Sequence, residues 1–324
     1  MPHDHSHAAG PGRIAPEDAR KITGAATWAS LAVAAVLVVS KAVVWWMSGS
    51  VALLASMADS MLDLTASLTV FFAVRYAAEP ADKEHRFGHG KAEAFASILQ
   101  AMLVAVSAAL LVREGIEHTW QPVELQASGW ALGVMVLSIV LTLALLAVQS
   151  RAIDETGSVA IEGDRAHYLS DLAANLAVII GIGGSTLGFA RLDGIAALAV
   201  AAWLGWTAWE VAKRALDQLM DRELPDEERA RIHDLAVGQD PRIIDVHDLR
   251  TRASGPLVHI QFHLALPPEM TLEDAHEVMV VCENRVLSVY PAADILIHAD
   301  PYGAAEPHGG SFFQGDAEAT DNDA

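Results

Sequence analysis

Six apolar stretches, each long enough to cross a bilayer, dominate the first two thirds of the chain, and two of them carry acidic residues in their interiors. A membrane-spanning helix needs about 20 consecutive, predominantly apolar residues. The stretches run over Ala25–Met47, Val51–Tyr76, Ala92–His118, Ser128–Val148, Val159–Leu187 and Leu192–Val211. The sequence therefore predicts an all-α transmembrane domain of six helices.

The composition agrees with a membrane protein and excludes several soluble classes. Only 19% of the residues are charged, whereas a soluble domain has about 25%. The formal net charge is −20, which excludes nucleic acid as the main partner because phosphate binding needs a basic face. The single cysteine, Cys282, excludes an intrachain disulfide and any cysteine-based zinc finger. The lipid bilayer is thus the first expected partner.

Lysine and arginine residues predict the orientation of the spans. Arg13, Arg20 and Lys21 precede the first stretch, and Lys83 and Arg86 lie between the second and third stretches. Short loops that are rich in these residues stay in the cytoplasm. We therefore expect both termini to be cytoplasmic.

Beyond residue 222 the apolar stretches give way to short elements. We predict helices over Pro225–Gly238 and Thr271–Ser288 and strands over Ile243–Arg252, Leu257–Leu266 and Asp294–His298. This order predicts a small cytoplasmic α+β domain. The chain is then divided into a disordered cytoplasmic segment over 1–23, the transmembrane domain over 24–214, the α+β domain over 215–302 and a disordered acidic tail over 303–324.

The acids inside the stretches carry most of the chemical information. Asp59 and Asp63 are four residues apart, as are His167 and Asp171, so each pair shares one face of its helix. Burying such groups in hydrocarbon costs a few kcal/mol each, and a divalent cation offsets that cost. Three carboxylates and an imidazole suit tetrahedral Zn²⁺, although protonated acids that only hold the helices together are an alternative. Lys41 lies near the outer end of its stretch, and we expect its side chain to extend to the interface.

These residues resemble the motifs of the cation diffusion facilitator family. The resemblance runs from about Gly24 to Pro301 and also includes the segments 80–93, 219–225 and 247–252. It is strongest to the bacterial zinc and ferrous-iron efflux proteins of the family. It implies a homodimeric, proton-coupled exporter of divalent transition metals in the bacterial inner membrane. It also implies a ferredoxin-like, metallochaperone-like fold for the cytoplasmic domain and a transport site formed by Asp59, Asp63, His167 and Asp171.

The resemblance implies further sites that spacing alone does not assemble. In the loop between the second and third stretches it implies a lower-affinity zinc site at Asp82, His85 and His89. In the cytoplasmic domain it implies a two-zinc cluster at the protomer interface, formed by His247, His263, His276, His298 and Asp300, with Asp300 bridging the metals. It also pairs Lys91 with Asp221 as a charge interlock. His233 and His259 have no counterpart in these sites, and we expect both to be solvated.

The chain departs from the resembled efflux proteins at two positions. It has Ala166 where they have a bulkier apolar residue beside the implied transport histidine, and we expect the smaller side chain to loosen a hydrophobic gate. It has Ala299 where they have a polar residue, so only the backbone carbonyl of Ala299 could serve as a ligand to the cytoplasmic cluster. The tract containing His3, His5 and His7 is a candidate for loose metal capture.

The favoured function is therefore metal export, with Zn²⁺ as the expected ion and Cd²⁺ or Fe²⁺ as alternatives that the same ligands accept. One alternative is a membrane-anchored metal sensor, which leaves the acids of the spans unexplained. Another is an intramembrane metal-dependent hydrolase, but a hydrolytic zinc site needs an open coordination position for water. We do not expect an enzyme.

Overall fold

The computed structural model describes residues 10–48, 51–120, 129–186, 192–238 and 240–304. They form two compact units, one built mainly from the chain up to Arg222 and the other mainly from the chain after Glu223. The histidine tract at residues 3–7 and almost all of the predicted acidic tail lie outside the described residues.

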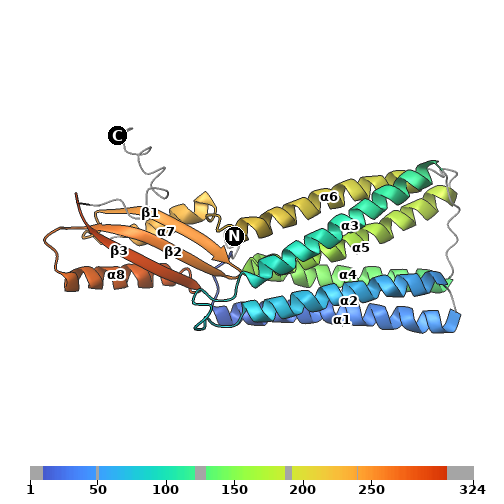
Figure 1. Cartoon of the computed structure of the whole chain (residues 1–324), viewed down its shortest axis with the longest axis horizontal. Helices are drawn as coiled ribbons and strands as arrows, with labels where there is room; N and C mark the ends of the chain where they lie inside the picture. The colour runs from blue at the N-terminus through green and yellow to red at the C-terminus, as the bar shows by residue number, and fades with distance from the viewer. Residues whose placement is uncertain (1–9, 49–50, 121–128, 187–191, 239, 305–324) are drawn as a thin grey trace, which may run out of the picture. The chain divides into compact units, whose positions relative to one another are not determined.

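The first unit is a bundle of six helices that run side by side (Figure 1). They are α1 (Pro16–Ser48), α2 (Val51–Ala77), α3 (Ala92–Trp120), α4 (Gly129–Thr156), α5 (Val159–Thr186) and α6 (Leu192–Leu219). Several continue beyond the predicted apolar stretches: α1 begins nine residues before Ala25, and α6 ends eight residues after Val211. The helical domain that the sequence predicts is confirmed, but its helices extend past the apolar windows because backbone hydrogen bonding does not stop where hydropathy falls.

Five of these helices, α1, α2, α3, α4 and α6, are long and apolar enough over their described residues to cross a membrane. The fifth helix, α5, carries Glu162, Asp164, Arg165 and Asp171 in its first half. Its polar groups face inward: Asp164 is 1% exposed and His167 is 6% exposed. A helix of this composition is stable inside a bundle because its neighbours, rather than lipid, surround the polar groups.

The fifth helix packs at the centre of three apolar clusters. Ala166 is in one cluster with residues of α3 and α6, Ala160 is in a second with residues of α2 and α3, and Ile161 is in a third with residues of α1 and α4. Alanines dominate these contacts, and small side chains let membrane helices approach closely. Ala166 is 4% exposed, so its small side chain contributes to a closely packed contact between α3, α5 and α6.

The approach of α3 to α6 is close enough to require glycine. A Cβ atom placed on Gly194 would lie 2.6 Å from the carbonyl oxygen of Gly115 and 2.7 Å from the backbone nitrogen of Thr119. Neither is the end of a flexible side chain, so no larger residue fits without moving one helix.

A buried carboxylate from α3 caps the first turn of α5. Glu93 is 1% exposed, and its Oε2 accepts a hydrogen bond from Ser158 Oγ at 2.5 Å. The backbone N–H groups of Val159 and Ala160 donate to the same carboxylate. The first N–H groups of a helix have no partner within it, and an anion there also interacts favourably with the helix dipole. Glu93 therefore determines where the helix that carries His167 and Asp171 begins.

The second unit is a small α/β domain. It contains α7 (Asp226–Val237), β1 (Asp245–Ser254), β2 (Leu257–Leu266), α8 (Leu272–Leu287) and β3 (Ala293–Pro301), and the strands form one sheet in the order β1-β2-β3. Alternate residues of β2, Ile260, Phe262 and Leu264, are fully buried. Alternation places His263 on the opposite face of the sheet. The predicted order of helices and strands is confirmed.

The predicted start of the last helix is also confirmed. Thr271 is the N-cap of α8, and its hydroxyl oxygen accepts a hydrogen bond from the backbone N–H of Asp274 at 3.2 Å. Such caps satisfy one of the free donors of the first turn.

We predict that Glu93→Ala lowers the stability of the bundle, because it leaves the buried donors at the start of α5 without an acceptor. The expected loss is about 2 kcal/mol, measured as a lower midpoint of thermal unfolding of the full-length protein in detergent. Glu93→Gln retains an acceptor and should lose less. The control is Glu114→Ala, an exposed acid on the same helix; equal midpoints for Glu93→Ala and Glu114→Ala would contradict the capping role.

Candidate metal sites

Side chains from α2 and α5 meet inside the helical bundle. His167 Nε2 lies 3.1 Å from Asp63 Oδ1 and 3.9 Å from Asp171 Oδ2. One ligand atom from each of these residues lies within 4.8 Å of the other two. Two carboxylates and an imidazole at this spacing are suited to a divalent cation such as Zn²⁺. We refer to Asp63, His167 and Asp171 as the bundle cluster.

Asp59, the fourth residue predicted for this site, is not in the bundle cluster. It lies one turn before Asp63 on the same face of α2, and its side chain is exposed. Its participation in the site stays a prediction.

A separate hydrogen-bond network lies next to the bundle cluster. Asp164 Oδ2 accepts hydrogen bonds from Ser30 Oγ at 2.6 Å and from Gln149 Nε2 at 2.8 Å. Asp164 Oδ1 lies 3.3 Å from Gln100 Nε2. These donors come from α1, α4 and α3, so this acid joins four helices through neutral partners and is not part of the bundle cluster.

Tyr168, the residue after the histidine of the cluster, extends this connection. Its hydroxyl donates to the carbonyl oxygen of Ser30 at 3.0 Å and lies 2.9 Å from Ser67 Oγ. Three helices, α1, α2 and α5, are therefore held together within one turn of His167.

Lys41 of α1 binds the neighbouring helix α2. Its ammonium group donates to Ser60 Oγ at 2.6 Å and to the carbonyl oxygen of Ser56 at 3.2 Å, both on α2. Its extension to the membrane interface stays a prediction, and the structure adds that α2 offers the ammonium group two acceptors.

The loop between α2 and α3 contains a second group of possible ligands. Asp82 Oδ1 lies 3.4 Å from His85 Nδ1, and Asp82 Oδ2 lies 3.4 Å from His89 Nε2. Asp82 also accepts hydrogen bonds from the backbone N–H groups of His85 and Glu84, which lower the pKa of its carboxyl group. His89 is 6% exposed and packs against the ring of Tyr76. The loop therefore presents an ionised carboxylate between two imidazoles.

A third group lies on the sheet of the second unit. Asp300 Oδ2 is 2.8 Å from His263 Nδ1 and 3.2 Å from His247 Nε2, and Asp300 Oδ1 is 3.2 Å from His298 Nε2. Desolvation opposes ionisation of Asp300, but the hydrogen bond from His263 and the three nearby imidazoles outweigh it and lower the pKa. His276 is exposed on α8 and lies outside the group formed by His247, His263 and Asp300, so its role as a ligand stays a prediction.

Two further acids, not among the predicted ligands, lie beside this group. Asp248 Oδ2 is 3.7 Å from His263 Nε2, and Asp245 Oδ2 is 3.5 Å from His247 Nδ1. Asp248 has a φ of 47°, a conformation that aspartate tolerates better than most residues, and it pairs with Arg250 at 2.9 Å. No sequence pattern signals this local turn of the backbone.

The sheet determines the surroundings of two residues near this third group, Ala299 and His259. Ala299 lies between His298 and Asp300 on β3, so its side chain points to the opposite face, and only its backbone is available to that group. His259 was expected to be solvated, and this is wrong: it is 5% exposed, and its Nδ1 lies 3.0 Å from Asp294 Oδ2 on β3.

A lysine just before α3 forms an ion pair with an aspartate just after α6. Lys91 Nζ lies 2.9 Å from Asp221 Oδ1 and 3.4 Å from the carbonyl oxygen of Leu219. Both charged side chains are more than one third exposed, so the pair contributes at most about 1 kcal/mol. Its value is geometric, because it joins the start of α3 to the residues that follow α6.

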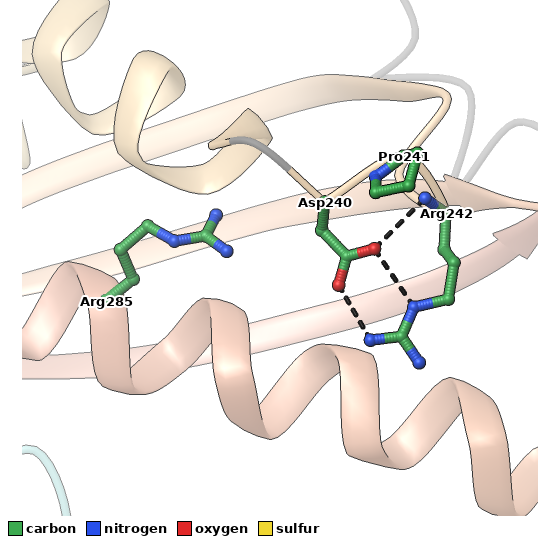
Figure 2. A pocket seen from close by; sticks show the side chains of 4 residues that line it. All are labelled: Asp240, Pro241, Arg242 and Arg285. Carbon is green, nitrogen blue, oxygen red and sulfur yellow. Dashed lines mark hydrogen bonds and ion pairs between the residues drawn. The ribbon is translucent and has the colours of Figure 1, made fainter.

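Figure 2 shows a surface pocket lined by Asp240, Pro241, Arg242 and Arg285. Arg242 donates to both carboxylate oxygens of Asp240 and lowers the pKa of that acid to about 2. Arg285 donates to the carbonyl oxygens of Leu235 and Ala236 at the end of α7. The arginines are thus engaged with the protein itself, and the pocket contains none of the three ligand groups.

A helical membrane bundle with acid and imidazole ligands in its interior, joined to a small α/β domain with ligands of its own, defines the class of metal-cation transporters. The model of the cation efflux transmembrane domain matches residues 27–220, and the model of the cation efflux cytoplasmic domain matches residues 224–302. The chain belongs to the cation efflux family, also called the cation diffusion facilitators. It is a multi-span cation efflux transporter, as the motifs in its sequence predict.

Two curated cation-efflux pumps are similar in sequence to most of this chain. The cation-efflux pump FieF of Yersinia enterocolitica is 41% identical over 286 residues, which are 88% of this chain and 95% of the relative. FieF of Yersinia pestis strain Pestoides F has the same identity and coverage. Among solved structures, the zinc form of CzrB matches with 32% identity over 27% of this chain and 100% of that chain, with a TM-score of 0.25.

The single cysteine has the properties of a core residue. Cys282 is 0% exposed, and desolvation raises the pKa of its thiol to about 11. Its Sγ donates to the carbonyl oxygen of Ala236 at 3.4 Å. A protonated, buried thiol is a poor metal ligand, which leaves nitrogen and oxygen as the donors of the described ligand groups.

We predict that Cys282 of the folded full-length protein reacts slowly with a maleimide between pH 7 and 9, because its raised pKa keeps the thiol protonated over that range. Denaturation should expose one reactive thiol per chain. A Cys282→Ala protein carrying Ser288→Cys, at an exposed position, is the control and should react rapidly when folded. Comparable rates for the two folded proteins would show that the thiol is accessible and ionised.

Proposed function

We propose that the protein is a proton-coupled antiporter that exports divalent transition-metal cations from the cytoplasm. Its transport site is formed by Asp59, Asp63, His167 and Asp171, and transport occurs by alternating access around this site. The observation that carries the proposal is the bundle cluster, in which ligand atoms from two membrane-spanning helices lie within 4.8 Å of one another. Curated relatives that are 41% identical and carry the name cation-efflux pump support it.

Zn²⁺ is the proposed principal ion, and Cd²⁺ and Fe²⁺ are the alternatives. Carboxylate and imidazole ligands accept all three, while a set of four such ligands favours the tetrahedral geometry of Zn²⁺. With Asp59 joining the bundle cluster, all four positions are filled by protein, and no position is left for a hydrolytic water. This distinguishes the proposed carrier from an enzyme.

Proton coupling follows from the chemistry of the ligands. The imidazole must be neutral and the carboxylates ionised before a metal ion binds, so binding releases protons. When the ion leaves on the outer side, the remaining carboxylates repel one another in a medium of low dielectric constant, and proton uptake relieves this repulsion. Protons therefore return to the cytoplasm as the metal leaves it.

The other two ligand groups are proposed as resident zinc sites. Asp82, His85 and His89 would hold zinc in the loop, and the cytoplasmic domain would hold zinc through His247, His263, His276, His298 and Asp300. The close approach of a buried carboxylate to three imidazoles at Asp300 supports the second site. Zinc bound there would crosslink the strands, and the match to the cytoplasmic domain of the family supports its role as the contact of a homodimer. The proposed location is the bacterial inner membrane, with both termini in the cytoplasm.

We predict that Asp63→Ala and His167→Ala each reduce zinc-driven proton flux in proteoliposomes to the level of protein-free vesicles. Each change removes a ligand from the bundle cluster and leaves the apolar contacts of α5 intact. Flux is measured with a pH-sensitive dye inside the vesicles after zinc is added outside, with an imposed pH gradient and a panel of Zn²⁺, Cd²⁺ and Fe²⁺.

The matched controls are Asp226→Ala and His233→Ala, at positions on α7 outside all three ligand groups. Both should transport like the parent protein. Parental flux in Asp63→Ala and His167→Ala would contradict the proposed transport site.

A further inference from the structure

Lys41 places a positive charge next to the face of α2 that carries the bundle cluster. Its ammonium donates to the hydroxyl of Ser60 and to the carbonyl oxygen of Ser56. Ser56, Ser60 and Asp63 follow one another at spacings of four and three residues, so they occupy one face of α2. The lysine is therefore held one turn away from Asp63.

The charge also acts on α5. The ammonium of Lys41 interacts electrostatically with the Asp171 carboxylate, and its side chain is only half-buried between the helices. Arg165, a cation on α5 itself, interacts electrostatically with Glu162. Lys41 thus brings a positive charge to the bundle cluster from α1, a helix that contributes none of the proposed ligands.

We propose that Lys41 is an affinity-determining residue of the transport site: a tethered cation that stabilises the empty, ionised cluster and opposes the divalent ion when it binds. The inference rests on the proposed function, because it assigns the lysine to the same site. Two hydrogen bonds hold the lysine against α2 and so keep its charge near the cluster. A positioned charge of this kind weakens binding and favours release.

The physical reason is a competition between like charges. Carboxylates without a counter-ion bind a divalent cation tightly, and a carrier that binds too tightly does not release its cargo. A fixed ammonium group destabilises the metal-bound state through direct repulsion and stabilises the metal-free state through attraction to the carboxylates. Both effects lower metal affinity, whereas loss of packing or of a hydrogen bond would not raise it.

The test is equilibrium binding of Zn²⁺ to full-length protein in detergent, with His85→Ala and His263→Ala introduced to weaken the other two ligand groups. Binding at the bundle cluster is the portion lost when Asp63→Ala is added. Lys41→Gln should lower the dissociation constant of this portion of the binding by roughly tenfold, the scale expected for charges that interact through partly solvated protein. Lys41→Arg retains the charge and should stay within about twofold of the parent.

Lys41→Met provides a second neutral variant, and both neutral variants are measured on the monodisperse fraction from size-exclusion chromatography. Unchanged or weaker binding in Lys41→Gln and Lys41→Met would overturn the role of the lysine while leaving the transport site in place. If Asp63→Ala removes no bound zinc in any background, the transport site itself fails and the inference fails with it.

Discussion

The structure depends on the free energy of keeping ionisable groups inside a helical bundle that spans a membrane. A charged side chain in hydrocarbon costs a few kcal/mol even on lenient scales. The chain satisfies these groups within the bundle, by giving the helix that carries most of them a central position among α1, α2, α3, α4 and α6. The alanine-rich contacts around α5 and the Glu93 cap at its first turn follow from that position.

A buried acid and a partly exposed acid, Asp164 and Asp171, occur on this one helix, and their partners distinguish them. Asp164 is surrounded by the hydroxyl of Ser30 and the amides of Gln100 and Gln149, which satisfy a carboxylate without any ion. Asp171 lies instead near an imidazole and a second carboxylate, and like charges at this distance need a cation or protons between them. The partners of each acid, rather than its burial, therefore separate the structural acid from the proposed ligand.

The sequence predicted the order of the elements and the class of the protein because these depend on long apolar stretches and on motifs with fixed spacing. The i, i+4 pair His167 and Asp171 needed only helical periodicity. The structure adds contacts that the sequence did not predict where a side chain binds a partner on another helix or strand. Lys41 binds Ser60 of α2, and His259 pairs with Asp294 rather than with solvent. Apolar periodicity does not encode such contacts.

If the bundle cluster exchanges a divalent metal for protons, metal binding must release protons, and counting these protons is the most direct test. Calorimetric titration of zinc into full-length protein, repeated in buffers with different ionisation enthalpies, counts the protons released at a fixed pH. We expect the parent protein to release more protons per chain than the Asp63→Ala protein, and we expect the Asp63→Ala protein to bind less zinc. Equal proton release and equal zinc binding in the two proteins would contradict it.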